Sequence, residues 1–186
     1  MRVLGVDPGL SRCGVGVVDG PSRRPVAVRA GVIRTAPDEP VPARLHHLHR
    51  VLTQVVADAA PDAVAVERVF FNANVRTAIA VAQAAGVVLL VAQAAGLPVT
   101  EYTPTQVKAA VAGTGDADKE QVGFMVRTLL RLEQIPRPAD AADALALALC
   151  HLNSGGGGAA AGTMSPRLAA AVAAAAPGAQ ITEGSR

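Results

Sequence analysis

The chain has 186 residues, with 17 Lys or Arg against 15 Asp or Glu, so its formal net charge is only +2. This balance excludes a basic arm or an acidic tail as the organising feature, and a nucleic-acid surface would have to be local. Aromatic residues make up 2% of the chain and Trp is absent, which disfavours a base-stacking platform of the RNA-binding kind. The two cysteines, Cys13 and Cys150, form neither a disulfide framework nor a metal motif. Their isolation favours a reducing, cytoplasmic compartment.

The first third of the chain is predicted to form an antiparallel meander. Three short apolar runs, bounded by Gly and Pro, predict strands at residues 2–7, 13–19 and 25–34. Residues 42–60 then repeat apolar side chains at helical spacing. Residues 62–67 follow as a buried strand of the kind found in parallel sheets.

The second half is predicted to be mainly helical, with one short strand at residues 97–102. Helices are expected at residues 74–96, 105–112, 118–132 and 140–152. Asp116 or Asp118 is well placed to cap the third of these helices. The order of elements predicts an α/β fold, a mixed five-stranded sheet with helices on both faces. From residue 153 the composition changes to Gly and Ala, so we expect a folded domain over residues 1–152 and a flexible tail over residues 153–186.

One segment raises the question of a membrane, because residues 78–99 carry no charge and are long enough to span a bilayer. Gln83, Gln93 and Pro98 interrupt this segment, and much of its apolar content is Ala. A buried helix running into a buried strand explains the same residues. We therefore expect a soluble protein without a membrane partner.

Four acidic residues occupy positions that are typical of functional sites. Asp7 ends the first predicted strand, and Glu67 ends the buried strand of residues 62–67. Asp140 and Asp143 lie three residues apart on the last predicted helix, so they share one face. A charged residue that closes an apolar strand is costly unless it is paired or holds a cation. Strand ends of α/β sheets are also common positions for functional sites.

Each of these acids also has an ordinary structural explanation when it is taken alone. Asp7 could be a turn residue, Asp140 and Asp143 could answer the helix dipole, and Glu67 could pair with a neighbouring arginine. Together they describe an all-oxygen site without His or Cys, which suits Mg²⁺ or Mn²⁺ better than zinc. Two such ions can activate a water and stabilise the leaving oxygen in an in-line displacement at phosphorus.

Four ordered blocks of the sequence resemble RuvC-type Holliday junction resolvases: GVDPGLSRCGVGVVD, AVERVFF, TPTQVKAAVAGTGDADKEQV and DAADALALALCH. The similarity covers residues 1 to about 152. It implies an RNase H-like fold, a homodimer and a Mg²⁺-dependent endonuclease with two ions per active site, in which Mn²⁺ can substitute. Such an enzyme cuts four-way DNA junctions by paired symmetric nicks during homologous recombination and DNA repair. The resemblance also implies a branch-migration motor of the RuvA and RuvB type as a partner.

Carried over by position, the resemblance implies that Asp7, Glu67, Asp140 and Asp143 are the catalytic, metal-binding carboxylates. It also implies three residues for DNA: Phe70 against the bases of the opened junction, and Lys108 and Lys119 near the scissile strand.

The residues alone leave these DNA contacts open. Lys108 and Lys119 are the only lysines in the chain, but both would also suit solvated helix positions, and Phe70 beside Phe71 would also suit a core. The chain departs from many members of the family at Ala85, where they carry Arg. This departure puts one basic contact on that helix in doubt.

Two other classes of function fit part of the sequence. A phosphotransferase or ATPase of the actin and sugar-kinase type also begins with a strand, an Asp-x-Gly turn and a second strand. That class needs a second phosphate loop, for which AGTGDA is a weak candidate, and the chain is short for two such halves. A catalytically silent DNA-binding relative has no reason to hold four repelling acids together.

Dimerisation is expected from the low net charge, because two copies can pool their basic surfaces across a two-fold axis. The apolar helix from about residue 78 to residue 95 is the candidate interface. The same helix could equally be internal core.

Overall fold

A computed structural model describes residues 1–69 and 75–155 of the chain. Its centre is a five-stranded sheet of order β3-β2-β1-β4-β5. The strands are β1 (Val3–Asp7), β2 (Arg12–Asp19), β3 (Val26–Arg34), β4 (Ala63–Glu67) and β5 (Val99–Tyr102). Strands β1, β2 and β3 pair in antiparallel fashion, and β1, β4 and β5 run parallel to one another. The predicted meander and the mixed five-stranded sheet are confirmed.

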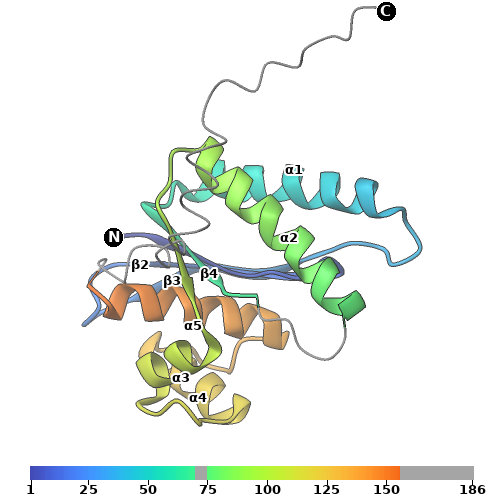
Figure 1. Ribbon diagram of the computed structural model, residues 1–186. Helices are drawn as coiled ribbons and strands as arrows, with labels where there is room; N and C mark the ends of the chain where they lie inside the picture. Colours follow the sequence, from blue (N-terminus) through green and yellow to red (C-terminus); the bar gives the residue numbers. More distant parts are fainter. Residues whose placement is uncertain (70–74, 156–186) are drawn as a thin grey trace, which may run out of the picture.

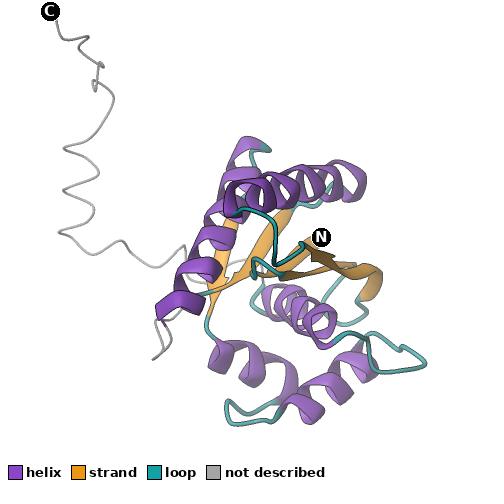
Figure 2. Ribbon diagram, turned by 90° about the vertical axis from the view of Figure 1, so that its right-hand side faces the viewer, coloured by secondary structure: helices purple, strands orange, loops and turns teal. Residues whose placement is uncertain are grey.

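Helices cover both faces of this sheet (Figure 1). Helices α1 (Val41–Ala59) and α2 (Val75–Ala94) lie on one face, and α5 (Ala139–Asn153) lies on the other. Figure 2 shows α3 (Pro104–Ala112) and α4 (Lys119–Leu129) beyond α5, on its side away from the sheet. Because α5 is enclosed between the sheet and these two helices, nearly all of its residues from Ala141 to Leu152 are buried.

The alternation of side chains along the strands decides which face each acidic residue occupies. In β1, Leu4 and Val6 join the core under α1 and α2, while Val3 joins the core under α5. Since successive residues of a strand point to opposite faces, Asp7 lies on the α5 side. The same alternation in β4 places Val66 with α1 and α2, and Glu67 on the α5 side.

Close packing of α5 on the sheet depends on glycines in β1 and β2. A Cβ at Gly14 would clash with the backbone of Asp140, and a Cβ at Gly16 would lie 2.7 Å from the amide nitrogen of Leu145. Gly5 faces the backbone of Ala144 in the same way. These three positions let the helix backbone rest directly against the sheet, and Gly14 does so at the turn of α5 that carries the acidic pair.

Helix α2 combines a buried face with an exposed one. Ala84, Val88 and Val91 belong to the core shared with α1. Ile79, Leu89 and Leu90 are exposed. The helix is long and apolar enough to cross a membrane by length and composition, with a third of the 77–94 window buried. Its packing against the body of the protein accounts for the apolar residues of its inner face.

Helix α4 differs from its prediction at the C-terminal end. Asp118 caps it through a capping box with Gln121, which selects one of the two predicted capping residues. The helix ends at Leu129 instead of residue 132, because Arg131 adopts a left-handed backbone with φ of 53°. Such a conformation cannot continue a right-handed helix.

Candidate active site

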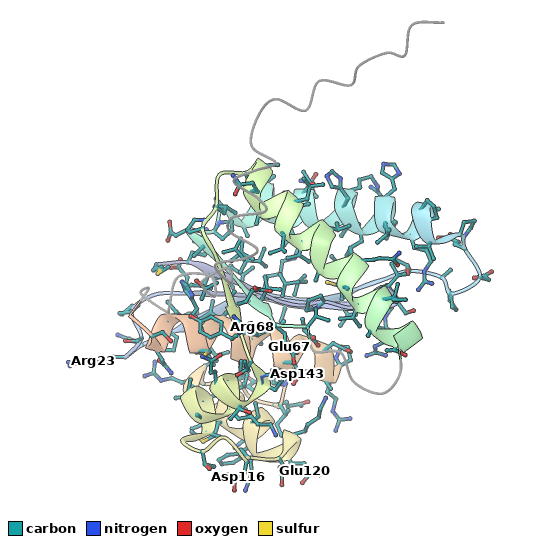
Figure 3. The ribbon with its side chains drawn as sticks, viewed as in Figure 1. Arg23, Glu67, Arg68, Asp116, Glu120 and Asp143 are labelled. Carbon is teal, nitrogen blue, oxygen red and sulfur yellow. The ribbon has the colours of Figure 1, made fainter. Side chains whose placement is uncertain are left out.

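Three elements bring the four predicted carboxylates to one edge of the sheet. Asp7 and Glu67 end two adjacent parallel strands, and the pair before them, Val6 and Val66, are register partners. Asp140 and Asp143 lie in the first turns of α5, above the same edge. Figure 3 shows Glu67 and Asp143 close together where β4 and α5 meet. The structure therefore places together residues that are up to 136 positions apart, from Asp7 to Asp143.

The carboxyl groups of Asp7 and Glu67 at the strand ends both have raised pKa values. The pKa of Asp7 is raised to about 8, first by burial and then by the negative charge of Glu67 and a hydrogen bond shared with it. The charges of Asp143 and Asp140 raise the pKa of Asp7 further. Burial also raises the pKa of Glu67, against the hydrogen bond with Asp7. At neutral pH the two strand-end carboxyls thus hold a proton between them.

The two carboxylates on α5 are instead held by cationic side chains. Arg12, the first residue of β2, donates from Nε to Oδ2 of Asp140 over 3.0 Å, and its Nη2 donates to the same oxygen. This contact with Arg12 lowers the pKa of Asp140. The Nζ of Lys119 lies 3.4 Å from Oδ2 of Asp143, and the charge of Asp143 raises the pKa of Lys119.

Both lysines of the chain border the site. Lys108 on α3 and Lys119 at the start of α4 line a pocket of about 130 Å³ together with Glu67 and Asp143. Lys119 is 80% exposed at its side chain, so it can reach a substrate at low cost in desolvation. The arrangement places two cations beside the carboxylates, where a phosphate group would need them.

Arg44, a buried arginine that supports the turn after Asp7, was not predicted from the sequence. Arg44 on α1 is only 8% exposed, and it donates from Nε to the hydroxyl of Thr35 over 2.8 Å and from Nη2 to that of Ser11 over 2.5 Å. Thr35 in turn donates to the carbonyl of Leu10 over 2.6 Å. Arg44 thereby braces the turn that follows Asp7. Its spacing of four residues from buried Leu48 was the signal that it points inward.

The donor set of the four acids suits a hard divalent cation. All ligands would be carboxylate oxygens, and a divalent cation would relieve the repulsion that raises the pKa of Asp7. In residues 1–69 and 75–155, no three acidic, His or Cys side chains stand close enough to hold a metal ion as they are. Asp140 and Asp143 are engaged by Arg12 and Lys119 instead.

Two further predictions concern residues outside this cluster. Phe70 lies outside the described residues, so its predicted contact with DNA bases stays a prediction. Ala85 on α2 is 8% exposed and packs inside the protein. In this chain the position therefore contributes to packing, and it supplies no basic surface.

The sequence and the fold match one family of proteins. The profile of the family described as crossover junction endodeoxyribonuclease RuvC matches residues 3–151. The RuvC protein of Salinispora arenicola is 59% identical over 172 residues, which is 92% of this chain and 94% of that protein. Thermus thermophilus RuvC, solved in complex with Holliday junction substrate, is similar with a TM-score of 0.80 and 42% identity over 83% of this chain and 94% of that one. The yeast mitochondrial Holliday junction resolvase shares the fold at 12% identity, with a TM-score of 0.61 over 81% of this chain and 78% of its own.

Proposed function

The chain belongs to the RuvC family of crossover junction endodeoxyribonucleases, and from this premise we propose that it resolves four-way DNA junctions by paired symmetric nicks. Its fold is RNase H-like, as in the solved junction resolvases. One observation carries the proposal: carboxylates from β1, β4 and α5 converge at one sheet edge, beside the only two lysines of the chain. This convergence suits phosphodiester hydrolysis in recombination and repair.

Asp7, Glu67, Asp140 and Asp143 are the residues that would hold Mg²⁺ in this enzyme, with Mn²⁺ able to replace it. Two bound ions would activate a water and stabilise the departing oxygen of the cut strand. The number of two is what the resemblance to the family implies, and four carboxylates would supply enough oxygen ligands for a pair of ions that keep part of their water shell.

The remaining residues of the site act on the DNA. Lys108 and Lys119 would hold the scissile phosphate against the carboxylates, since both line the pocket that Glu67 and Asp143 share. Asp7 and Glu67 hold one proton between them in the protein alone, so they face the phosphate with less charge than two free carboxylates would carry. Phe70 is assigned to the bases of the opened junction on the strength of its motif alone.

Paired nicking requires two active sites, so we propose that the enzyme works as a homodimer. The exposed apolar side chains of α2, Ile79, Leu89 and Leu90, support this helix as the contact between the copies.

The nuclease unit would comprise residues 1–152, with residues 153–186 as an appended tail. A cytoplasmic location and a branch-migration motor of the RuvA and RuvB type as partner follow from the family.

A nuclease assay on branched and linear DNA tests the proposal. With Mg²⁺, the full chain should cut a synthetic four-way junction and leave a linear duplex of the same sequence largely intact, and EDTA should stop the reaction. An ATP-hydrolysis assay under the same conditions should show no turnover. Equal cutting of linear and branched DNA, or ATP hydrolysis without nicking, would contradict the proposed function.

A further inference from the structure

Among the cationic side chains of the described residues, Arg12 makes the closest contact with the four carboxylates. Both of its donors, Nε and Nη2, reach the same oxygen, Oδ2 of Asp140. The arginine side chain is 45% exposed and the aspartate side chain 25% exposed, so the pair sits at the mouth of the site and not beneath it. A cation that uses Asp140 as a ligand must compete with this guanidinium.

Two contacts hold the backbone around Arg12 in place. Arg12 follows the turn after Asp7, and Gly9 in that turn approaches the carbonyl oxygen of Arg12 so closely that a Cβ would clash with it. The hydroxyl of the preceding Ser11 accepts from buried Arg44. These contacts hold the backbone of Arg12 at the start of β2, and from there its side chain reaches Asp140.

Arg34 provides an internal comparison. It is the register partner of Arg12 across the β2–β3 pair, so both side chains point to the same face of the sheet. Arg34 is exposed and one strand further from the carboxylates. The two arginines carry the same charge at the same sheet edge, but the salt bridge to Asp140 belongs to Arg12.

We propose that Arg12 is a positioning residue that acts as the built-in counter-ion of Asp140, competes with the divalent cation for this carboxylate and so sets the metal concentration that the enzyme requires. The inference rests on the proposed function, because it takes Asp140 as a metal ligand. Before metal binds, Arg12 offsets the negative charge of Asp140 beside the other carboxyl groups of the site. When the cation binds, Asp140 exchanges a guanidinium for a metal ion.

The test is direct binding of Mn²⁺ to the full-length protein without DNA, measured by electron paramagnetic resonance or calorimetry. Replacing the guanidinium by a neutral group in Arg12→Gln should lower the Kd for Mn²⁺ roughly three- to tenfold. Arg12→Lys, which keeps the charge but loses the fork of two donors, should give an intermediate Kd. Arg34→Gln should leave the Kd within about twofold of the wild-type value, because screening weakens a charge one strand away.

Activity supplies a second readout. The Mg²⁺ concentration that gives half-maximal junction cleavage should fall in Arg12→Gln by about the same factor as the Kd. An unchanged Kd in a folded Arg12→Gln protein would overturn the inference, and so would an equal gain in Arg34→Gln. If Arg12→Gln does not fold, a Kd in Arg12→Lys equal to that of the wild type would overturn it.

Failure of the proposed function would look different. In that case Mn²⁺ binding to the wild type would be absent, or would be unaffected by Asp7→Asn and Asp140→Asn. Mn²⁺ binding that these two substitutions weaken, combined with no effect of Arg12→Gln, would remove the role of Arg12 and leave the metal site in place.

Discussion

Asp7 is placed where folding and catalysis make opposite demands on a carboxyl group. Its position at the end of β1, against Glu67 and under α5, raises its pKa to about 8. Folding would be easier with a neutral side chain there, and a metal site needs the charged form. Asp7 therefore contributes to function but lowers the free energy of unfolding, by an amount that depends on pH.

This cost predicts a pH dependence of the metal-free protein. Between its unfolded pKa, about 3.9, and its folded pKa, about 8, Asp7 binds more proton in the folded state. The free energy of unfolding therefore falls as pH rises through this window, and the loss is complete above the folded pKa. Asp7→Asn should lose less, and at about pH 9 it should be more stable than the wild type by on the order of a few kcal/mol.

Thermal unfolding in EDTA at about pH 5, 7 and 9, followed by circular dichroism, measures the effect. Asp58→Asn is the matched control, because Asp58 is exposed and lies on α1, away from the sheet edge that carries the site. Its unfolding temperatures should follow the wild type at every pH. Parallel curves for the wild type and Asp7→Asn would show that Asp7 does not carry the predicted penalty.

Arg44 acts on the site without touching the carboxylates. Arg44→Met keeps the volume of the stem but leaves Thr35 and Ser11 without their donor, so we expect a loss of about 1–3 kcal/mol in the free energy of unfolding. The turn after Asp7 should loosen, and junction cleavage should fall. Urea denaturation and a cleavage assay measure the two effects. Arg50→Met, on the exposed side of the same helix, should stay within about 0.5 kcal/mol of the wild type; the idea fails if the two variants behave alike.

The sequence identified the acidic residues but not the arginines that serve them. Asp7 and Glu67 were visible because each closes an apolar strand, and Asp140 and Asp143 because of their spacing on one helix. The partners of Arg12 and Arg44 in these contacts lie 128 and 33 positions away in the chain. Sequence periodicity gives the direction of such a side chain but not the partner that the tertiary fold brings to it.

The position of α5 on the sheet decides the geometry of the site. Gly14 on β2 allows the backbone of Asp140 to approach the sheet. Gly14→Ala should push this end of the helix outward, with a loss of about 1–3 kcal/mol in the free energy of unfolding. Displacing the carboxylates should lower cleavage by roughly ten- to a hundredfold, even when the protein is folded and saturated with Mg²⁺.

A second glycine of the same sheet offers the control. A Cβ added at Gly31 on β3 would meet no atom within 4 Å apart from those of its own chain neighbours. Gly31→Ala should therefore leave stability and cleavage near the wild-type values. Chemical denaturation and cleavage rates of the two variants, measured side by side, decide the question; equal effects would remove the role assigned to the close approach of α5.

Most elements could be predicted because local patterns agree with the fold. The three strands of the meander and the buried strand β4 are confirmed within one or two residues. The end of α4 could not be predicted, since Leu130 and Leu132 continue the apolar pattern beyond Leu129, where the helix ends before the left-handed Arg131. The two-faced character of α2 was equally hidden, because Val88 and Leu89 are both apolar and only the fold shows that one is buried and the other exposed.

The exposed apolar side chains of α2 predict how two copies of the protein assemble. Leu90 is 59% exposed and Val88 is 3% exposed. Leu90→Asp, and to a lesser degree Leu89→Asp, should weaken the dimer roughly tenfold or more while the monomer stays folded. Val88→Asp should unfold the chain, because it buries an unpaired charge. Sedimentation velocity at micromolar concentration, with circular dichroism for folding, separates these outcomes. A wild-type protein that sediments as a monomer and still makes paired cuts would contradict the proposed dimer.

The role of the strand-end carboxylates is tested most directly by cleavage and binding of one four-way junction. Each strand is labelled in turn, and the wild type is compared with Asp7→Asn and Glu67→Gln. In Mg²⁺ the wild type should nick two opposite strands at symmetric positions. Each variant should cut at least about a hundredfold more slowly, while its Kd for the junction stays equal to or below that of the wild type, because neither substitution adds a negative charge near the phosphate. Near-normal cleavage by either variant would show that these strand-end carboxylates do not hold the metal ions that cut DNA.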